Sequence, residues 1–228
     1  MEPKGFAEIE IIGGLFGQHV APGTRIGNGH AVAGERCVVA GDVIRQIDAA
    51  EAEGVRFLLL VLEGEGGHAE ATLDVYRRIV RFQREGGHVI AWVRGRVASA
   101  LPIIAAAADR VFMAAEGRII LHGAHAPEGH EADAALANEA WAAILAARNG
   151  VPRAQLAVWL GHPDVTTEVH AAGAVRLGWA DGEVHTLDFA QKWVHAAARW
   201  PKAMVRPENA TARSIRLAGR TAAVASVA

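Results

Sequence analysis

Apolar positions along the chain fall into two patterns, short continuous runs and longer segments with helical spacing. Residues 7–16 (AEIEIIGGLF), 55–62 (VRFLLLVL) and 88–93 (HVIAWV) are apolar runs typical of strands, the last two buried on both faces. Residues 41–52 and 69–84 place apolar side chains on one helical face. Because strand and helix patterns alternate, the sequence predicts an α/β fold.

The second half of the chain continues this alternation. The apolar run 97–108 predicts a helix, and residues 130–149 predict a long alanine-rich helix that ends at Gly150. Residues 17–34 are rich in glycine and predict a loop, with a hairpin as one option. The remaining predicted elements are strands at 109–114 (DRVFMA) and 117–122 (GRIILH), short helices near 152–161 and 170–177, a strand near 182–185 and a last helix at 188–199.

No repeat of solenoid period and no linker divides the chain, so residues 1–200 are expected to form one domain. Residues 201–228 change in character. From Arg199 to Arg220 the chain carries five arginines and one lysine against a single acid, Glu208. We expect this basic tail to be a flexible, solvated extension, with binding to a partner, nucleic acid or a capsid-like assembly as the alternative.

Composition excludes several classes of protein. Of the 228 residues 51% are hydrophobic and 21% are charged, which excludes intrinsic disorder. The net charge of −2 gives no basic field for nucleic acid or an anionic membrane. The first ten residues lack a signal-peptide pattern, and the apolar run 97–108 is shorter than the about 20 residues that a bilayer requires. Cys37 is the only cysteine, so a cytoplasmic location is expected.

The first candidate site is the pair Gly66-Gly67, which follows a predicted strand. Adjacent glycines allow a positive φ and let backbone N–H groups approach a ligand closely. An ordinary tight turn explains the same pair equally well.

The surrounding segment 64–69 (GEGGHA) also matches the dinucleotide fingerprint G-x-G-x-x-A. Glu63 and Glu65 oppose this interpretation, because carboxylates repel a pyrophosphate. The strand 88–93 also ends without the acid that binds the ribose, although Arg94 could serve a 2′-phosphate. A dinucleotide site remains a minor alternative.

The second candidate is Ser99, which follows a strand and a glycine turn at the start of the apolar run. A serine there points into the positive end of a helix, where free N–H groups stabilise an oxyanion. Pro102 fits the first turn of that helix. The alternative is that Ser99 is a helix N-cap.

The third candidate is His122, which completes the strand GRIILH. An imidazole at the edge of a sheet can act as general base for a neighbouring nucleophile. A structural histidine is the simple alternative. A metal site from His122, His125 and His130 is disfavoured, because their spacing suits no single helix or strand.

In this order the motifs resemble the ClpP-type serine peptidases, which include the Clp protease proteolytic subunit and phage prohead maturation proteases. Family members read N-S-P-G-G, G-x-A-A-S-M and M-I-H-x-P. This chain has LEGEGG at 62–67, GRVASA at 95–100 and ILH at 120–122. The segment 173–181 (GAVRLGWAD) is similar to the family's E-A-x-x-x-G-x-x-D element. The resemblance covers residues 41–186 and implies a ClpP/crotonase-like fold of repeated β-β-α units.

By this resemblance Ser99 matches the nucleophile and His122 the general base, while the N–H groups of Gly67 and Ala100 match the oxyanion hole. The third member of the triad is less well defined. The family's aspartate falls opposite Thr166, and Asp164 lies two residues earlier. Asp164 is the expected third member, with Thr166 or a different partner as alternatives.

The sequence therefore predicts a serine endopeptidase that acts on peptide or protein substrates without a cofactor or a metal. The resemblance also implies that the helix at 130–149 mediates a homo-oligomer, with a ring-type assembly as one form; the alternative is that this helix packs on its own core. The first 40 residues do not match the subunit that docks on an unfoldase, so dependence on such a partner is doubtful. The alternative functions are a catalytically inactive scaffold of the same fold and an acyl-CoA- or dinucleotide-binding enzyme.

Overall fold

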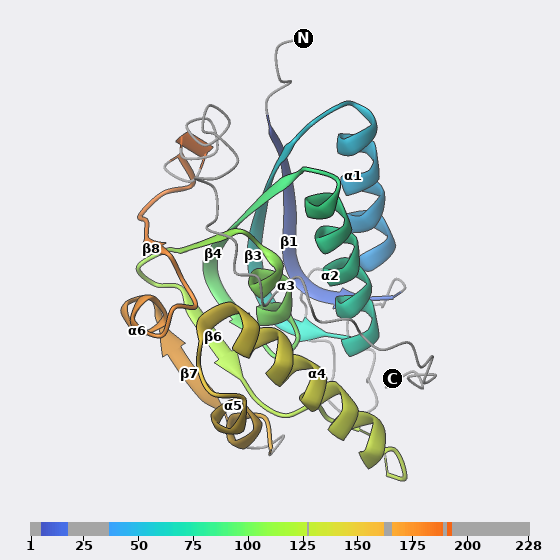
Figure 1. Cartoon of the computed structure of the whole chain (residues 1–228), viewed down its shortest axis with the longest axis vertical. Helices are drawn as coiled ribbons and strands as arrows, with labels where there is room; N and C mark the ends of the chain where they lie inside the picture. Colours follow the sequence, from blue (N-terminus) through green and yellow to red (C-terminus); the bar gives the residue numbers. More distant parts are fainter. Residues whose placement is uncertain (1–5, 18–36, 127, 162–165, 189–190, 193–228) are drawn as a thin grey trace.

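The computed structural model describes residues 6–17, 37–126, 128–161, 166–188 and 191–192, which form a twisted sheet with helices packed against it (Figure 1). Its elements are β1 (Phe6–Phe16), β2 (Cys37–Val39), α1 (Ala40–Ala52), β3 (Phe57–Gly67), α2 (Ala69–Arg84), β4 (His88–Ala98), α3 (Leu101–Ala107), β5 (Arg110–Met113), β6 (Arg118–Leu121), α4 (Glu131–Asn149), α5 (Arg153–Trp159), β7 (Thr167–His170), α6 (Ala171–Arg176) and β8 (Gly182–Glu183).

The strands form one mixed sheet, which confirms the α/β class. The order β2-β1-β3-β4-β5-β8 is parallel throughout. Strand β6 also runs parallel to β4, whereas β7 pairs with β6 in the antiparallel direction. Parallel neighbours require crossover connections, and the helices supply them.

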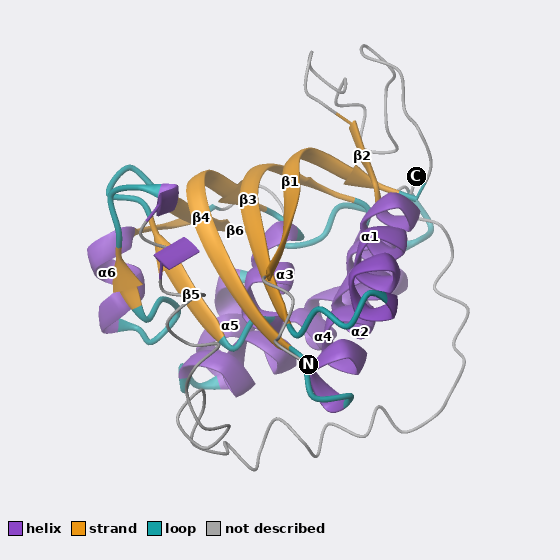
Figure 2. Cartoon of the chain, turned by 90° about the horizontal axis from the view of Figure 1, so that it is seen from above, coloured by secondary structure: helices purple, strands orange, loops and turns teal. Residues whose placement is uncertain are grey.

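The central strands are buried on both faces, as their continuous apolar runs predict. In β3, Leu58 and Leu60 join the larger core cluster on the helical side, while Leu59 and Val61 join a smaller cluster on the opposite face. Figure 2 shows helices α1 to α4 together on one side of β1, β3 and β4. Burial on both faces explains the absence of polar residues from positions 57–62 of this strand.

The helices form where the sequence predicts them because their apolar spacing matches the sheet surface. Helix α2 buries Val75, Ile79 and Phe82, which are four and three residues apart and lie on one face. Helix α4 ends at Gly150, which adopts φ 71°, a left-handed conformation that suits glycine at a helix end. None of the helices in the described segments is long and apolar enough to cross a membrane.

The long strands change partners along their length. Strand β4 pairs with β5 from Ile90 to Val93. It then pairs with β6 from Arg96 to Ala98. Strand β3 shows a register shift between Leu62 and Gly64. Each long strand therefore has an N-terminal part in the main sheet and a C-terminal part that bends into a second group of strands.

Two predictions from the sequence are wrong at these bends. The strands predicted at 55–62 and 88–93 were expected to end there, but residues 63–67 and 94–98 continue them as parts of β3 and β4. The glycines that indicate turns serve close backbone approach instead. An added Cβ at Gly64 would lie 2.1 Å from the carbonyl oxygen of Gly13 in β1. Only glycine allows the two backbones to pass at this distance.

Two ion pairs join the bent parts of β3 and β4. Arg94 pairs with Glu63, and Arg96 donates to Glu65 at 2.8 Å. All four side chains are partly exposed. Such pairs add little stability, but they fix the lateral position of the two strands.

The structure differs from the prediction in two further places. Helix α3 starts at Leu101 rather than at residue 97, because Val97 and Ala98 complete β4. Strand β7 was not predicted as a strand, since its four residues have little apolar character. The predicted loop or hairpin at 17–34, most of the last helix at 188–199 and the tail at 201–228 lie outside the described residues, so the proposed domain boundaries stay predictions.

We predict that Gly64→Ala destabilises the fold far more than Gly54→Ala. Both glycines have positive φ values, 154° and 79°, but a Cβ at Gly54 would meet nothing within 4 Å. Gly54→Ala should therefore cost only about 1 kcal/mol of backbone strain, whereas Gly64→Ala adds overlap with β1 and should cost about 3 kcal/mol or more. Urea unfolding measures both. Equal losses would contradict the role of Gly64 in close strand approach.

Candidate active site

Ser99 lies at the sharp turn between β4 and α3. Its φ is 56°, and it is the only non-glycine residue with a positive φ among those that the structure describes. The N–H of Ser99 donates to the carbonyl of Ile120 in β6 at 3.0 Å. The N-cap of α3 is Ala100 and no side chain caps this helix, so the serine hydroxyl is not used as a cap.

Gly66 lies directly against Ser99. A Cβ added at Gly66 would lie 2.4 Å from the Ser99 Cβ and 3.0 Å from its Oγ. The structure therefore brings the glycine pair and the serine together, as the resemblance implies. The contact of Gly66 with Ser99 was not predicted; its signal in the sequence is the first of two adjacent glycines.

The two expected oxyanion donors belong to two different elements: Gly67 is the last residue of β3, and Ala100 is the N-cap of α3. The N–H of His68 donates to Leu15 of β1 at 2.9 Å. Successive N–H groups along a strand point to opposite edges, which directs the N–H of Gly67 away from β1 and towards β4. A Cβ at Gly67 would lie 1.8 Å from the Leu15 carbonyl oxygen. Ala100 follows Ser99 and is fully buried at the start of α3.

His122 follows the last residue of β6 and is half-buried. Its Nδ1 lies 2.7 Å from the carbonyl oxygen of Gly123, and its ring packs edge-on against His125 with centroids 5.3 Å apart. Because a carbonyl oxygen can only accept, Nδ1 carries the proton and Nε2 has the free lone pair.

Ser99 and His122 stand at the ends of neighbouring strands. Ala98 pairs with Ile120, so Ser99 lies one residue and His122 two residues beyond the last pair of the two strands. Neighbouring strands lie about 4.8 Å apart, so the two residues belong to the same end of the sheet. Within the described segments the serine hydroxyl and the imidazole do not hydrogen-bond to each other.

The candidates for the third member of the triad are Asp164 and Thr166. Asp164 lies outside the described residues. Thr166 is exposed and immediately precedes β7, where Thr167 pairs with Leu121. One step further in this antiparallel register sets Thr166 beside His122. Neither Thr166 nor any described carboxylate forms a hydrogen bond or an ion pair with the His122 ring.

Two aromatic side chains that the sequence did not single out border the site. Gly14 pairs with Gly66, and the Phe16 ring covers Gly14, with its nearest atom 2.6 Å from a Cβ added there. The His68 ring contacts Phe16 edge-on at 5.7 Å. Burial lowers the pKa of His68, and the nearby carboxylate of Glu70 opposes this shift.

The glycine segment has a structural explanation that needs no nucleotide. Gly64 and Gly67 contact the backbone of β1, and Gly66 contacts Ser99. Glu63 and Glu65 beside this segment pair with Arg94 and Arg96, so Arg94, the sequence's candidate for a 2′-phosphate, already has a carboxylate partner. No group of three or more histidine, cysteine, aspartate or glutamate side chains within the described part of the chain is arranged to hold a metal ion.

No protein-family model matches the chain, and no curated protein matches it. The geometry around Ser99 and His122 is therefore the main guide to the chemistry of this site.

We predict that the pKa of His68 lies below the ordinary histidine value and that Glu70→Gln lowers it further, because removal of the carboxylate leaves only the effect of burial. The unfolded chain then takes up the proton first, so folding stability declines as the pH falls from the ordinary value to the lowered one. Histidine ring signals followed by NMR against pH measure the pKa. Glu139→Gln, far along the chain on α4, is the control and should leave it unchanged. A pKa above the ordinary value would contradict the burial.

Proposed function

We propose that the chain is a serine endopeptidase in which Ser99 is the nucleophile and His122 the general base. The observation that carries this proposal is the left-handed conformation of Ser99 at a strand-to-helix turn. A non-glycine residue in that conformation costs about 1 kcal/mol or more and is kept where the strain serves a function. The same turn presents the nucleophile in other serine hydrolases, where the N–H after the serine contributes to the oxyanion hole.

The chemistry follows from the positions of these groups. Nε2 of His122 accepts the proton of the Ser99 hydroxyl while Oγ forms a bond to the substrate carbonyl carbon. The N–H groups of Gly67 and Ala100 stabilise the negative oxygen of the tetrahedral intermediate. The imidazolium then donates its proton to the leaving amine as the C–N bond breaks, and water releases the acyl group by the same steps in reverse order.

Peptide hydrolysis is proposed over other acyl transfers because the motifs resemble ClpP-type peptidases in their order. Three features support a ClpP/crotonase-like fold: the bent strands, the pairing of β4 with both β5 and β6, and a helix after each pair of strand segments. Acyl-CoA enzymes of this fold polarise a carbonyl with two N–H groups as well. Their framework does not require Ser99 or His122, which favours the peptidase.

One observation favours the alternative of a catalytically inactive scaffold. Ser99 and His122 are not hydrogen-bonded to each other within the described segments. Catalytic hydrogen bonds are often long without substrate and tighten on binding, so this separation also fits an active enzyme. The two functions differ in whether Ser99 is chemically activated.

We predict that a fluorophosphonate probe labels the wild-type chain, and that Ser99→Ala and His122→Ala both abolish labelling. The serine is reactive only when a base accepts its proton. Ser214→Ala is a matched control, because Ser214 and Ser226 are the only other serines, and it should retain full labelling. Mass spectrometry should place the adduct on Ser99. A folded wild-type chain that resists the probe would support the scaffold instead.

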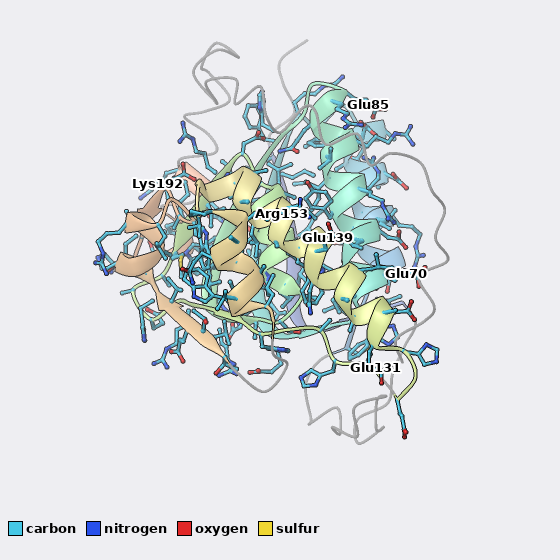
Figure 3. All side chains as sticks on the ribbon, turned by 60° about the horizontal axis from the view of Figure 1, so that its bottom comes forward. Glu70, Glu85, Glu131, Glu139, Arg153 and Lys192 are labelled. Atoms are coloured by element: carbon cyan, nitrogen blue, oxygen red, sulfur yellow. The ribbon has the colours of Figure 1, made fainter. Side chains whose placement is uncertain are left out.

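We further propose that α4 mediates a homo-oligomer. The first turns of α4 expose Ala132, Ala135 and Leu136, and 49% of the Leu136 surface is accessible. The later part is held on the body of the protein, where Glu139 pairs with Arg153 of α5 at 2.5 Å (Figure 3). An apolar strip beside a fixed helix segment suits contact with a second copy.

We predict that Leu136→Asp lowers the oligomeric state at micromolar concentration, because a charge in an apolar interface remains unpaired. Sedimentation velocity measures the distribution of species. Val175→Asp is the control: Val175 is also exposed, at 40%, but lies on α6. If both variants behave as the wild type does, α4 is not the contact surface.

A further inference from the structure

The orientation of the His122 ring has a visible cause in the structure, the backbone carbonyl of the next residue. The Nδ1–O distance to Gly123 is 2.7 Å, which is short for a hydrogen bond between neutral groups. Gly123 is buried and His122 half-buried, so water competes little for this contact.

This contact fixes the tautomer that a general base requires. The carbonyl has no proton to donate, so Nδ1 must carry one and Nε2 must be unprotonated in the neutral ring. In serine hydrolases with a triad, an aspartate does the same work and also supplies a negative charge that stabilises the imidazolium. A carbonyl supplies the orientation and a dipole, but no charge.

The other groups that could take this role are occupied or distant within the described segments. Asp133 pairs with His130 at 3.1 Å, and Glu168 pairs with Arg118 at 3.0 Å. Thr166 lies nearest in register but forms no hydrogen bond with the ring. Among the residues that the structure describes, the only hydrogen-bond acceptor on Nδ1 is thus the Gly123 carbonyl.

We propose that the main-chain carbonyl of Gly123 is the positioning group for His122, so that the site works as a Ser–His dyad and does not depend on the carboxylate of Asp164. The proposal rests on the proposed function of Ser99 and His122. Gly123 acts through the ring and does not contact the reacting atoms.

The first test is the rate of fluorophosphonate labelling in Asp164→Asn and Thr166→Val. We expect both rates to stay within about threefold of the wild type, because under this proposal neither side chain orients the His122 ring. Asp133→Asn is the matched control for loss of a nearby carboxylate. Asparagine in place of a triad aspartate lowers the rate by about 10⁴ where the carboxylate sets the tautomer. A drop of about 100-fold or more in Asp164→Asn, with unchanged unfolding, would overturn the proposal.

The second test reads the tautomer without relying on activity. The ¹⁵N shifts of the His122 ring, assigned by comparison with His122→Gln, report which nitrogen is protonated above neutral pH. We expect a protonated Nδ1 in the wild type and in Asp164→Asn alike. Protonation at Nε2, or a change of tautomer in Asp164→Asn, would overturn the proposal. A correct tautomer in a chain that resists the probe would instead refute the proposed function and leave the role of Gly123 intact.

Discussion

The candidate site depends on how closely the backbone of β3 approaches its neighbours. At Gly64 and Gly67 an added Cβ would overlap the backbone of β1, and at Gly66 it would overlap Ser99. These three positions lie within four residues, at the point where the strand bends away from the main sheet. The contact at Gly66 brings the bent part of β3 against the turn between β4 and α3, next to the N–H groups that the proposed oxyanion hole would use.

The same bend brings charge near the site, and the structure neutralises it locally. Glu63 and Glu65 stand beside the glycines, where an unpaired carboxylate would oppose a developing oxyanion. Each is paired with an arginine of β4, at positions 94 and 96. The pairs add little to stability because they are exposed. In each pair the guanidinium lies against the carboxylate, which reduces the net negative charge beside the glycines.

Apolar periodicity predicted the helices and strands whose limits follow from apolar spacing. It failed where glycine contacts or pairing with a neighbouring strand determine the structure. The limits of α2 follow from apolar spacing alone. The bent part of β3 could not be predicted, because a glycine pair has the same signal for a tight turn and for close strand contact. Strand β7 forms only because β6 offers it an edge. Ser99 and His122 were found through motif order, whereas the Phe16–His68 contact depends on a strand register that the sequence does not encode locally.

The strained conformation of Ser99 depends on the residues around it. A left-handed residue relaxes unless its neighbours hold it. Ser99 is held by three of them: Gly66 against its side chain, the Ile120 carbonyl on its N–H, and the buried Ala100 that starts α3. Strand β3, strand β6 and helix α3 thus meet at one residue. The stability of the whole core maintains the strain at this turn, so the position of the hydroxyl is a property of the fold rather than of a local motif.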